Sequence, residues 1–360
     1  MASNTLSPSP ELPELFLALK RTESTFEEIP VIDLANACSK DTVARRKLAD
    51  LIRDACINVG FFYIKSHGIS EDLIEKTVDV AKTYFALPEE TKMELDIHKT
   101  PNFKGYTALF GENTDSNGLG DLHEGFDLGW EPAIDSTQVD TSAEAPRNDG
   151  AMSGENVWPT GLPGFKETVL DYYQRVLQVG QLLFPLFALA LDLPENYFDD
   201  KTTKPAAIMR LLHYPPQNPT SFETDPDGRQ IGIGAHTDYE CFTILWQDRS
   251  GGLQVQNTAG KWVDAVPIPG TLVVNLGDQF ARWTNDIFKS TLHRVINRSG
   301  TERYSIPLFF GTDYDVRLEP IPTCVTPGSP YKYEIMTAGE YVKSRLEATY
   351  AHSAPVASAA

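Results

Sequence analysis

Apolar residues recur at helical spacing in the N-terminal half of this chain. Leu48, Ile52, Cys56 and Val59 fall on one face, and Gly60 follows them. An apolar stripe of this period indicates an amphipathic helix packed on a core, and a glycine is a common residue just past a helix end. The sequence therefore predicts a helix that ends at Gly60.

Further elements follow from the same reasoning. The run Phe61 to Ile64 predicts a buried strand, and Ser70 is a favourable N-cap for a second helix whose buried side ends at Phe85. Residues 165–193 predict a long helix, in which Pro185 should produce a kink because proline lacks an amide donor.

The pattern changes from Ala206 onward into short strands separated by turns. Turn sequences occur at Asp225 (DPDG) and Ser250 (SGG), and a final helix is expected at residues 340–350. Helices first and strands later predict an α+β protein with a two-sheet β core.

Composition narrows the function classes. The chain has 360 residues, 41% of them hydrophobic, and a formal net charge of −19. A substantial core is expected, and a nucleic-acid partner is not, since that would need a basic face. No apolar run is long enough for a membrane span, and no signal peptide is recognisable. Four scattered cysteines favour a reducing compartment, so a cytoplasmic location is expected.

The most informative polar residues are two histidines and one aspartate. His236 and Asp238 stand in GAHTDYE, and His293 stands in KSTLHRV. Residues i and i+2 of an extended strand point to the same side, so His236 and Asp238 can reach one ion. Two histidines and a carboxylate on one face of an octahedral metal are the iron site of non-haem Fe(II) oxygenases.

A second pair follows the metal candidates. Arg303 and Ser305 lie two residues apart in ERYSIPLFF, so a strand there would place both on one face. A guanidinium and a hydroxyl together predict a binding site for a carboxylate.

Seven ordered motifs resemble one known family. They are IPVIDL at 29–34, the GFF and HGI segments within 54–70, RLLHYPP at 210–216, HTD at 236–238, VNLGDQFARWTND at 274–286, and the later HRV and RYS. Together they are similar to the 2-oxoglutarate- and Fe(II)-dependent oxygenases of the isopenicillin N synthase-like superfamily, over roughly residues 28–320.

The resemblance implies a fold and an organisation. The core is expected to be a double-stranded β-helix, a distorted jelly roll, with N-terminal helices, a long supporting helix and a C-terminal helix. The expected divisions are a flexible lead at 1–27, an N-terminal dioxygenase region at 28–135, a loop with the long helix at 136–205, the jelly-roll core at 206–320, a C-terminal segment at 321–350 and a disordered tail at 351–360.

The resemblance also implies residue roles. His236, Asp238 and His293 would hold Fe(II), which would react with O2, while Arg303, Ser305 and Tyr214 would bind the cosubstrate 2-oxoglutarate. One position departs from the family pattern. Leu212 stands where many plant members have an asparagine, so that hydrogen bond is missing. His213 is a candidate substitute donor, although a histidine on a strand face or in the core is the more common case.

The substrate is less well defined by the sequence. Aromatic candidates for the pocket wall are Tyr106, Phe110, Phe126 and Phe309, although an aromatic residue in such a position is more often plain core than a substrate contact. They favour a small, largely apolar molecule such as a secondary metabolite. Long polar stretches at 111–121 and 142–155 could form a lid or plain surface loops.

Two alternatives remain open at this level. One is an iron oxidase of the same fold that, like isopenicillin N synthase, uses no 2-oxoglutarate. The other is a non-catalytic binding protein that keeps the jelly roll. No obligate protein partner is evident from the sequence.

Overall fold

Two β-sheets form the centre of the computed structural model, which describes residues 25–114, 120–131, 154–217 and 231–351. Four predicted features lie wholly or in large part outside these residues: the two flexible ends, the DPDG turn and the two long loops taken together. No helix among the described residues is long and apolar enough to cross a membrane.

The larger sheet has eight strands in the order β1-β2-β10-β7-β12-β5-β4-β3. All neighbours are antiparallel except β1 and β2. The strands span Val31–Asp33 (β1), Phe61–Lys65 (β2), Gly105–Thr107 (β3), Glu124–Leu128 (β4), Ala207–Tyr214 (β5), Phe242–Gln247 (β7), Thr271–Leu276 (β10) and Arg303–Phe310 (β12).

The smaller sheet has four strands in the order β6-β11-β8-β9. They span Ile233–His236 (β6), Leu253–Gln256 (β8), Trp262–Asp264 (β9) and His293–Val295 (β11). Two sheets that are antiparallel apart from the β1–β2 pair agree with the jelly-roll core that the sequence predicted.

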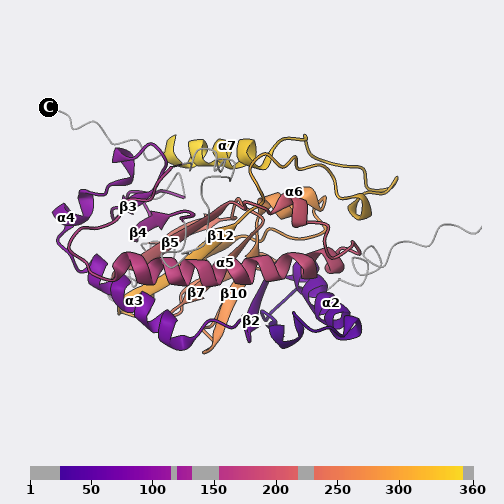
Figure 1. Ribbon diagram of the computed structural model, residues 1–360, viewed down its shortest axis with the longest axis horizontal. Coiled ribbons are helices and arrows are strands. Elements are labelled where there is room, and N and C mark those ends of the chain that lie inside the picture. The colour runs from indigo at the N-terminus through magenta and orange to yellow at the C-terminus, as the bar shows by residue number, and fades with distance from the viewer. Residues whose placement is uncertain (1–24, 115–119, 132–153, 218–230, 352–360) are drawn as a thin grey trace, which may run out of the picture.

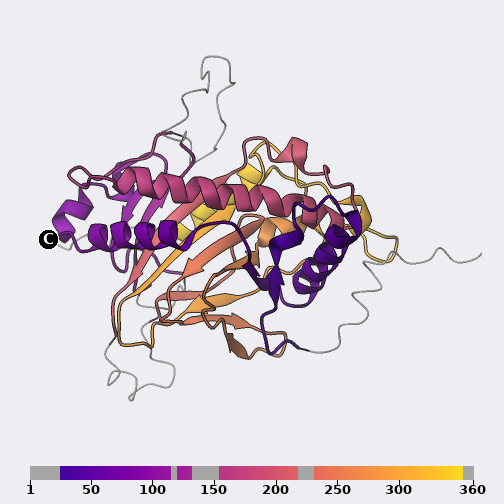
Figure 2. The same ribbon diagram turned by 60° about the horizontal axis from the view of Figure 1, so that its bottom comes forward.

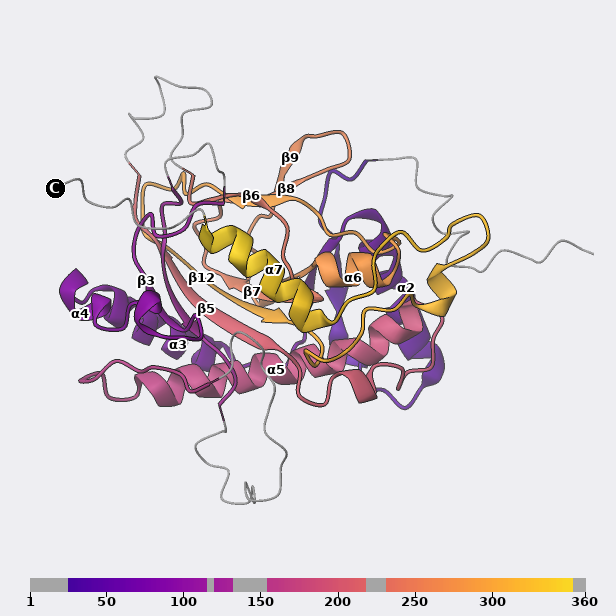
Figure 3. The same ribbon diagram turned by 90° about the horizontal axis from the view of Figure 1, so that it is seen from above.

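Helices pack around the two sheets. They are α2 (Thr42–Asn58), α3 (Glu71–Phe85), α4 (Glu89–Met93), α5 (Phe165–Ala190), α6 (Asp278–Trp283) and α7 (Ala338–Ala351). Figures 1 and 2 show α5 lying across the larger sheet with α3 beside it, whereas Figure 3 shows α7 on another side of the sheets. The larger sheet therefore has one face covered by helices and one that faces the smaller sheet.

The predicted helices are confirmed in kind, with some differences in extent. Helix α2 ends at Asn58, and Gly60 follows with φ of 73°, a conformation that favours glycine. The Ser70 hydroxyl accepts a hydrogen bond from the Leu73 amide as the N-cap of α3. Helix α5 continues through Pro185 without a break and ends at Ala190.

Aromatic packing fixes α5 on the sheet. The ring of Phe184 lies 5.3 Å from that of Phe242 on β7 and 5.6 Å from that of Phe310 on β12. Gly180 is necessary here because a Cβ atom would lie 2.2 Å from the Phe310 ring. This contact holds the strand that carries Arg303 and Ser305 against the helix layer.

Candidate active site

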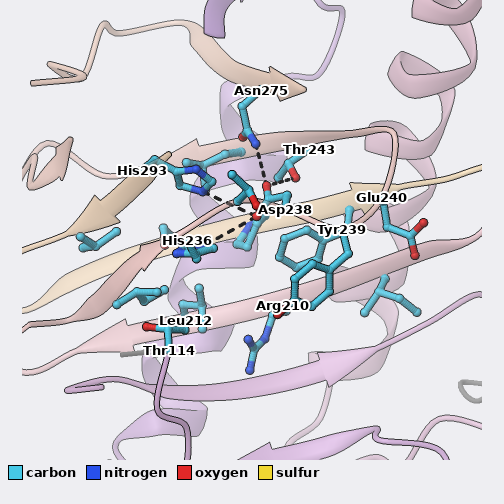
Figure 4. Close-up of a pocket in the computed structure, with 18 of the residues that line it drawn as sticks. Thr114, Arg210, Leu212, His236, Asp238, Tyr239, Glu240, Thr243, Asn275 and His293 are labelled. Carbon is cyan, nitrogen blue, oxygen red and sulfur yellow. Dashed lines mark hydrogen bonds and ion pairs between the residues drawn. The ribbon is translucent and has the colours of Figure 1, made fainter. Parts of the chain in front are cut away.

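Two histidines face each other across the smaller sheet. His293 on β11 pairs directly with His236 at the end of β6, and their ring centroids are 4.3 Å apart. Asp238 follows in the turn toward β7, and its Oδ1 lies 3.6 Å from the Nε2 atom of each histidine. Figure 4 shows the three side chains converging on one point. Strand register thus brings together residues that are far apart in the sequence.

Backbone carbonyls orient both imidazole rings. His236 Nδ1 lies 2.8 Å from the Gly234 carbonyl oxygen, and His293 Nδ1 lies 3.1 Å from that of Thr291. A carbonyl only accepts, so each Nδ1 carries the proton and donates it. Each Nε2 therefore faces Asp238, with a lone pair available to a metal in the neutral imidazole and a proton for the carboxylate in the protonated one.

The carboxylate of Asp238 is held by its other oxygen. Oδ2 accepts hydrogen bonds from the Asn275 side-chain amide at 2.6 Å and from the Thr243 hydroxyl. Burial by itself would raise the pKa of Asp238, but the two neighbouring histidines hold it well below its usual range. Asp238 is therefore an ionised, fixed ligand whose Oδ1 remains directed at the histidines.

These three side chains fit a divalent metal. Their ligand atoms all lie within 4.8 Å of one another, and no other group of three such residues occurs in the part of the chain that the structure describes. Two imidazole nitrogens and one carboxylate oxygen on one side leave the opposite side open. That donor set is the one that binds Fe(II) in non-haem oxygenases.

A close backbone contact fixes the turn that carries Asp238. The amide of Gly277 donates to the Cys241 carbonyl at 2.9 Å, and the amide of Asp278 donates to the Asp238 carbonyl at 2.8 Å. A Cβ atom on Gly277 would lie 2.2 Å from the Glu240 carbonyl oxygen. Only glycine allows this close approach, so Gly277 in the VNLGD motif helps to hold the turn that carries Asp238.

A buried cation lies in the same cavity as the three ligands. Arg303 is completely buried and stands at the start of β12, directly opposite Tyr214 on β5. Its Nε donates to the Gly251 carbonyl at 2.6 Å, one terminal nitrogen donates to Ser305 Oγ at 3.2 Å, and its guanidinium carbon lies 4.5 Å from the Tyr214 ring centroid. The predicted group of Arg303, Ser305 and Tyr214 is thus assembled at one place.

No carboxylate pairs with Arg303 among the residues that the structure describes. Its remaining side-chain partner is the amide oxygen of Gln247, at 3.4 Å. A fully buried guanidinium without an acid is unusual, since buried charges in proteins are generally paired. Arg303 is therefore suited to bind an anionic ligand in the cavity.

Strand parity separates Leu212, which departs from the family pattern, from His213, the candidate substitute donor. Leu212 lies opposite Ser305 and lines the cavity, where it offers no hydrogen bond. His213 points to the other face, with Nδ1 2.7 Å from Glu124 Oε1 and its ring stacked on Tyr304 at 4.9 Å. His213 is thus no substitute donor in the cavity, because successive strand residues face opposite sides.

The metal candidates and Arg303 share one cavity of about 180 Å³. Its other wall residues include Phe309 and Pro307 of β12, Ile208 of β5, and Val342 and Leu346 of α7. Phe309 is therefore placed on the cavity wall, as the sequence suggested. The wall is mostly apolar, with a few polar groups at defined positions, which is typical of a site for a small molecule.

A buried ionic network forms one side of this cavity. Arg210 on β5 donates to Asp127 Oδ1 at 2.6 Å and to Glu112 Oε1 at 2.6 Å. Burial raises the pKa of Asp127 to about 6, although Arg210 opposes this shift. For Glu112, the charges of Arg210 and His123 outweigh burial and lower the pKa. These residues give the cavity a rigid polar flank.

Three of the four aromatic wall candidates lie elsewhere. Tyr106 and Phe126 are paired on β3 and β4 and belong to the core under α5, where the Phe126 ring lies 5.6 Å from Phe165. The next residue, Asp127, faces the cavity, so Phe126 must face away. Phe110 is 50% exposed, with φ of 61°, and is not a cavity residue.

Several cavity residues were not anticipated from the sequence. They include the two residues that hold Asp238 (Asn275 and Thr243), the polar flank (Glu112, Asp127 and Arg210) and Glu240. Asn275 had a usable signal, because it is the polar residue in the otherwise apolar strand TLVVNL. The others depend on contacts between distant segments.

Comparisons with known proteins agree with this geometry. Residues 29–161 match the family described as non-haem dioxygenase in morphine synthesis N-terminal, and residues 205–312 match the 2OG-Fe(II) oxygenase superfamily. The chain is 37% identical to the 2-oxoglutarate-Fe(II) type oxidoreductase hxnY of Emericella nidulans, over 89% of this chain and 90% of that protein. It is 34% identical to the 2-oxoglutarate-dependent dioxygenase citB of Monascus ruber, over 91% and 97%.

A solved structure shows the same overall arrangement. A full-length Neurospora crassa protein, crystallised in complex with alpha-KG and thymine, superposes with a TM-score of 0.77 at 32% identity, over 89% of this chain and 96% of that one. These relatives cover nearly the whole chain, so the similarity includes both the N-terminal region and the two-sheet core.

Proposed function

Because the chain belongs to the 2-oxoglutarate- and Fe(II)-dependent oxygenase superfamily, we propose that the cluster of His236, Asp238 and His293 is its iron site and that the adjoining cavity binds a small organic substrate. The protein is a 2-oxoglutarate-dependent dioxygenase that uses Fe(II), 2-oxoglutarate and O2. The homologues support this activity rather than a cosubstrate-free oxidase or a binding protein.

Iron at this site supplies the dioxygen chemistry that couples oxidative decarboxylation of 2-oxoglutarate to oxidation of a substrate C–H bond. The protein residues prepare the site for it. The Nδ1–H groups of His236 and His293 donate to carbonyls, which leaves each Nε2 directed at the ligand position. Asn275 prevents Asp238 from rotating, so the three ligands stay on one face.

The observation that carries the cosubstrate proposal is the buried, acid-free guanidinium of Arg303. We assign it the distal carboxylate of 2-oxoglutarate, with Ser305 adding a hydroxyl donor. Gly251 and Tyr214 fix the guanidinium plane from two sides. A guanidinium group that is already fixed in its plane loses little conformational entropy on binding. It therefore favours a carboxylate that accepts two parallel hydrogen bonds in one orientation.

The substrate is proposed to be a small organic molecule, such as a secondary metabolite, oxidised by hydroxylation, desaturation or ring formation. The mostly apolar wall with Phe309 supports an apolar body near the metal. The thymine bound by the Neurospora crassa relative is also a small molecule. The protein would position the target C–H bond and exclude water while the cavity is filled.

An anaerobic titration tests the cosubstrate proposal without knowledge of the substrate. Chelation of Fe(II) by 2-oxoglutarate is expected to give a visible charge-transfer band when the cosubstrate is added to the Fe(II)-loaded protein. Zn(II) and Co(II) should compete for the same ligands and inhibit. A protein that binds no iron, or that binds iron but gives no band, would contradict the proposal.

A further inference from the structure

The cavity continues past the metal cluster to an end opposite Arg303. On β12, Arg303, Ser305, Pro307 and Phe309 alternate along the face that lines the cavity. Phe309 pairs with Thr243, the residue that holds Asp238. The metal ligands therefore lie near the Phe309 end of this strand. Cavity residues beyond Phe309 are on the opposite side of the metal ligands from Arg303.

Glu240 occupies this far end. It follows Asp238 by two residues, is 5% exposed, and lines the cavity together with Tyr314 and with Val342 of α7. Its carboxyl group abuts Gly311, the first residue after β12, where a Cβ atom would lie 2.2 Å from Oε2. In Figure 4 the Glu240 side chain extends away from the cluster of metal ligands.

The Oε2 atom of Glu240 has no hydrogen-bond partner among the described residues. Gln279 interacts with the same carboxyl group but leaves this oxygen unsatisfied. The other buried acids are Glu112, Asp121, Glu124, Asp127 and Asp238, and each accepts hydrogen bonds from neighbouring side chains or amides. An unsatisfied buried oxygen costs free energy, and Glu240 is one of the residues that line the cavity, so this carboxyl group is suited to a donor on the ligand.

We propose that Glu240 accepts a hydrogen bond from the substrate, so that the enzyme selects small molecules that carry an amine or hydroxyl group at the end remote from the oxidised carbon. This inference rests on the proposed function, because it assumes that the cavity holds the substrate. The apolar wall around Phe309 would receive the body of the molecule, and Glu240 would set its direction in the cavity. Glu240 is thus a specificity residue that acts at the opposite end from the cosubstrate.

Three probes of similar size test this selectivity. They are benzylamine and benzyl alcohol, which carry a donor, and benzyl methyl ether, which has none. Binding is measured by calorimetry on the protein loaded anaerobically with Fe(II) and 2-oxoglutarate. We expect both donor probes to bind the wild-type protein about tenfold or more tightly than the ether, the effect of one hydrogen bond to a buried carboxyl group.

Variants then locate the effect. In Glu240→Leu, the ratio of the affinities for the donor probes and for the ether should fall to about one. Gly311→Ala retains the carboxyl group but displaces it, so it should also lower the preference. Glu240→Gln keeps the shape of the side chain and an acceptor oxygen, and should retain the preference for benzyl alcohol. The matched control is Glu347→Gln, an exposed glutamate on α7, which should behave as the wild-type protein.

The charge-transfer band of the iron–2-oxoglutarate complex is recorded for every variant. If the wild-type protein gives no band, the proposed function fails. If the band is present, this inference is overturned when the wild-type protein binds none of the probes, binds all three alike, or when Glu240→Leu and Gly311→Ala both keep the wild-type preference.

Discussion

The two ends of the cavity are built in different ways. At one end, Arg303 and Ser305 stand on a central strand between β5 and β7, and register places Arg303 opposite Tyr214. At the other end, Glu240 comes from a turn, Gly311 follows a strand, and Val342 belongs to α7. The first end depends on hydrogen-bonded pairing within one sheet, whereas the second depends on how separate segments meet.

This difference matches the two tasks of the site. Cosubstrate binding needs a fixed geometry, and paired strands hold side chains more rigidly than connecting segments do. Selection among substrates is more often performed by loops and terminal helices on a rigid scaffold. We therefore expect variants at the Arg303 end of the cavity to affect turnover of every substrate, and variants at the Glu240 end to affect which substrates are accepted.

The largest effect should come from the metal ligands. His236→Ala, Asp238→Ala and His293→Ala should each abolish succinate formation, because two ligands do not complete the coordination face. All three side chains line the cavity, so the fold should stay largely intact. Iron content and succinate release measure this. Asp238→Glu should also fail in large part, and a wild-type rate in any of the Ala variants would exclude the assignment.

Two phenylalanines on opposite faces of the larger sheet sharpen the comparison. Phe126→Ala removes a fully buried core ring and should lower the free energy of unfolding by about 3–5 kcal/mol, with the affinity for 2-oxoglutarate unchanged. Phe309→Ala should weaken binding of the benzyl methyl ether probe by about tenfold with little loss of stability, because this ring lines the cavity. Urea unfolding and calorimetry separate the two effects. A reversed pattern would mean that the faces are assigned wrongly.

Asn275→Ala should weaken iron binding by about 10–100-fold, the usual range for a residue that orients a metal ligand. Turnover at saturating iron should survive, since the three ligands remain. Asn257→Ala is the matched control: it removes an amide that donates to the Phe26 carbonyl outside the cavity. Iron titrations of the two variants should differ, and equal affinities would contradict the proposed role of Asn275.

The smallest effect concerns His213, on the face of β5 away from the cavity. Burial lowers its pKa, but its bonds to Glu124 and Glu302 outweigh burial and raise the pKa above the usual value. Because the pKa of His213 is higher in the folded than in the unfolded protein, its protonation stabilises the fold. This stabilisation is complete below about pH 6.5 and is lost as the pH rises through the pKa of the folded protein. The unfolding free energy of the wild-type protein should therefore fall more between about pH 6 and pH 9 than that of His213→Gln.

The same variant separates His213 from its neighbours on β5. The 2-oxoglutarate affinity of His213→Gln should equal that of the wild-type protein, because the side chain lies on the other face from Arg303. A weaker 2-oxoglutarate affinity, or an unchanged pH dependence, would contradict this placement.

Sequence reasoning was most successful where short motifs set local geometry. The spacing of Arg303 and Ser305 reflects side-chain alternation on β12, whereas Asp238 lies in the turn just past the end of β6. The structure brings both predicted pairs into one cavity. The helix and its N-cap at Ser70 were likewise readable, since capping depends on residues three positions apart.

Sequence reasoning failed where no local pattern separates one face from the other. Strand β4 is buried at every position, so its sequence EGFDL gives no alternation to show that Phe126 faces the helices and Asp127 the cavity. The position of Glu240 was equally hidden, because its surroundings come from the residue after β12 and from α7. Such contacts are set by packing between distant segments.

The most direct test of the account is the affinity of Arg303→Ala for 2-oxoglutarate. Removing one partner of a buried ion pair costs about 3–5 kcal/mol, so this variant should need about 10²–10³-fold or more additional 2-oxoglutarate to develop the charge-transfer band. Arg303→Lys should also bind it less tightly, because a point charge does not reproduce the fork. Iron content should stay at the wild-type level in both. An unchanged 2-oxoglutarate affinity in Arg303→Ala, or full turnover with none added, would contradict the account.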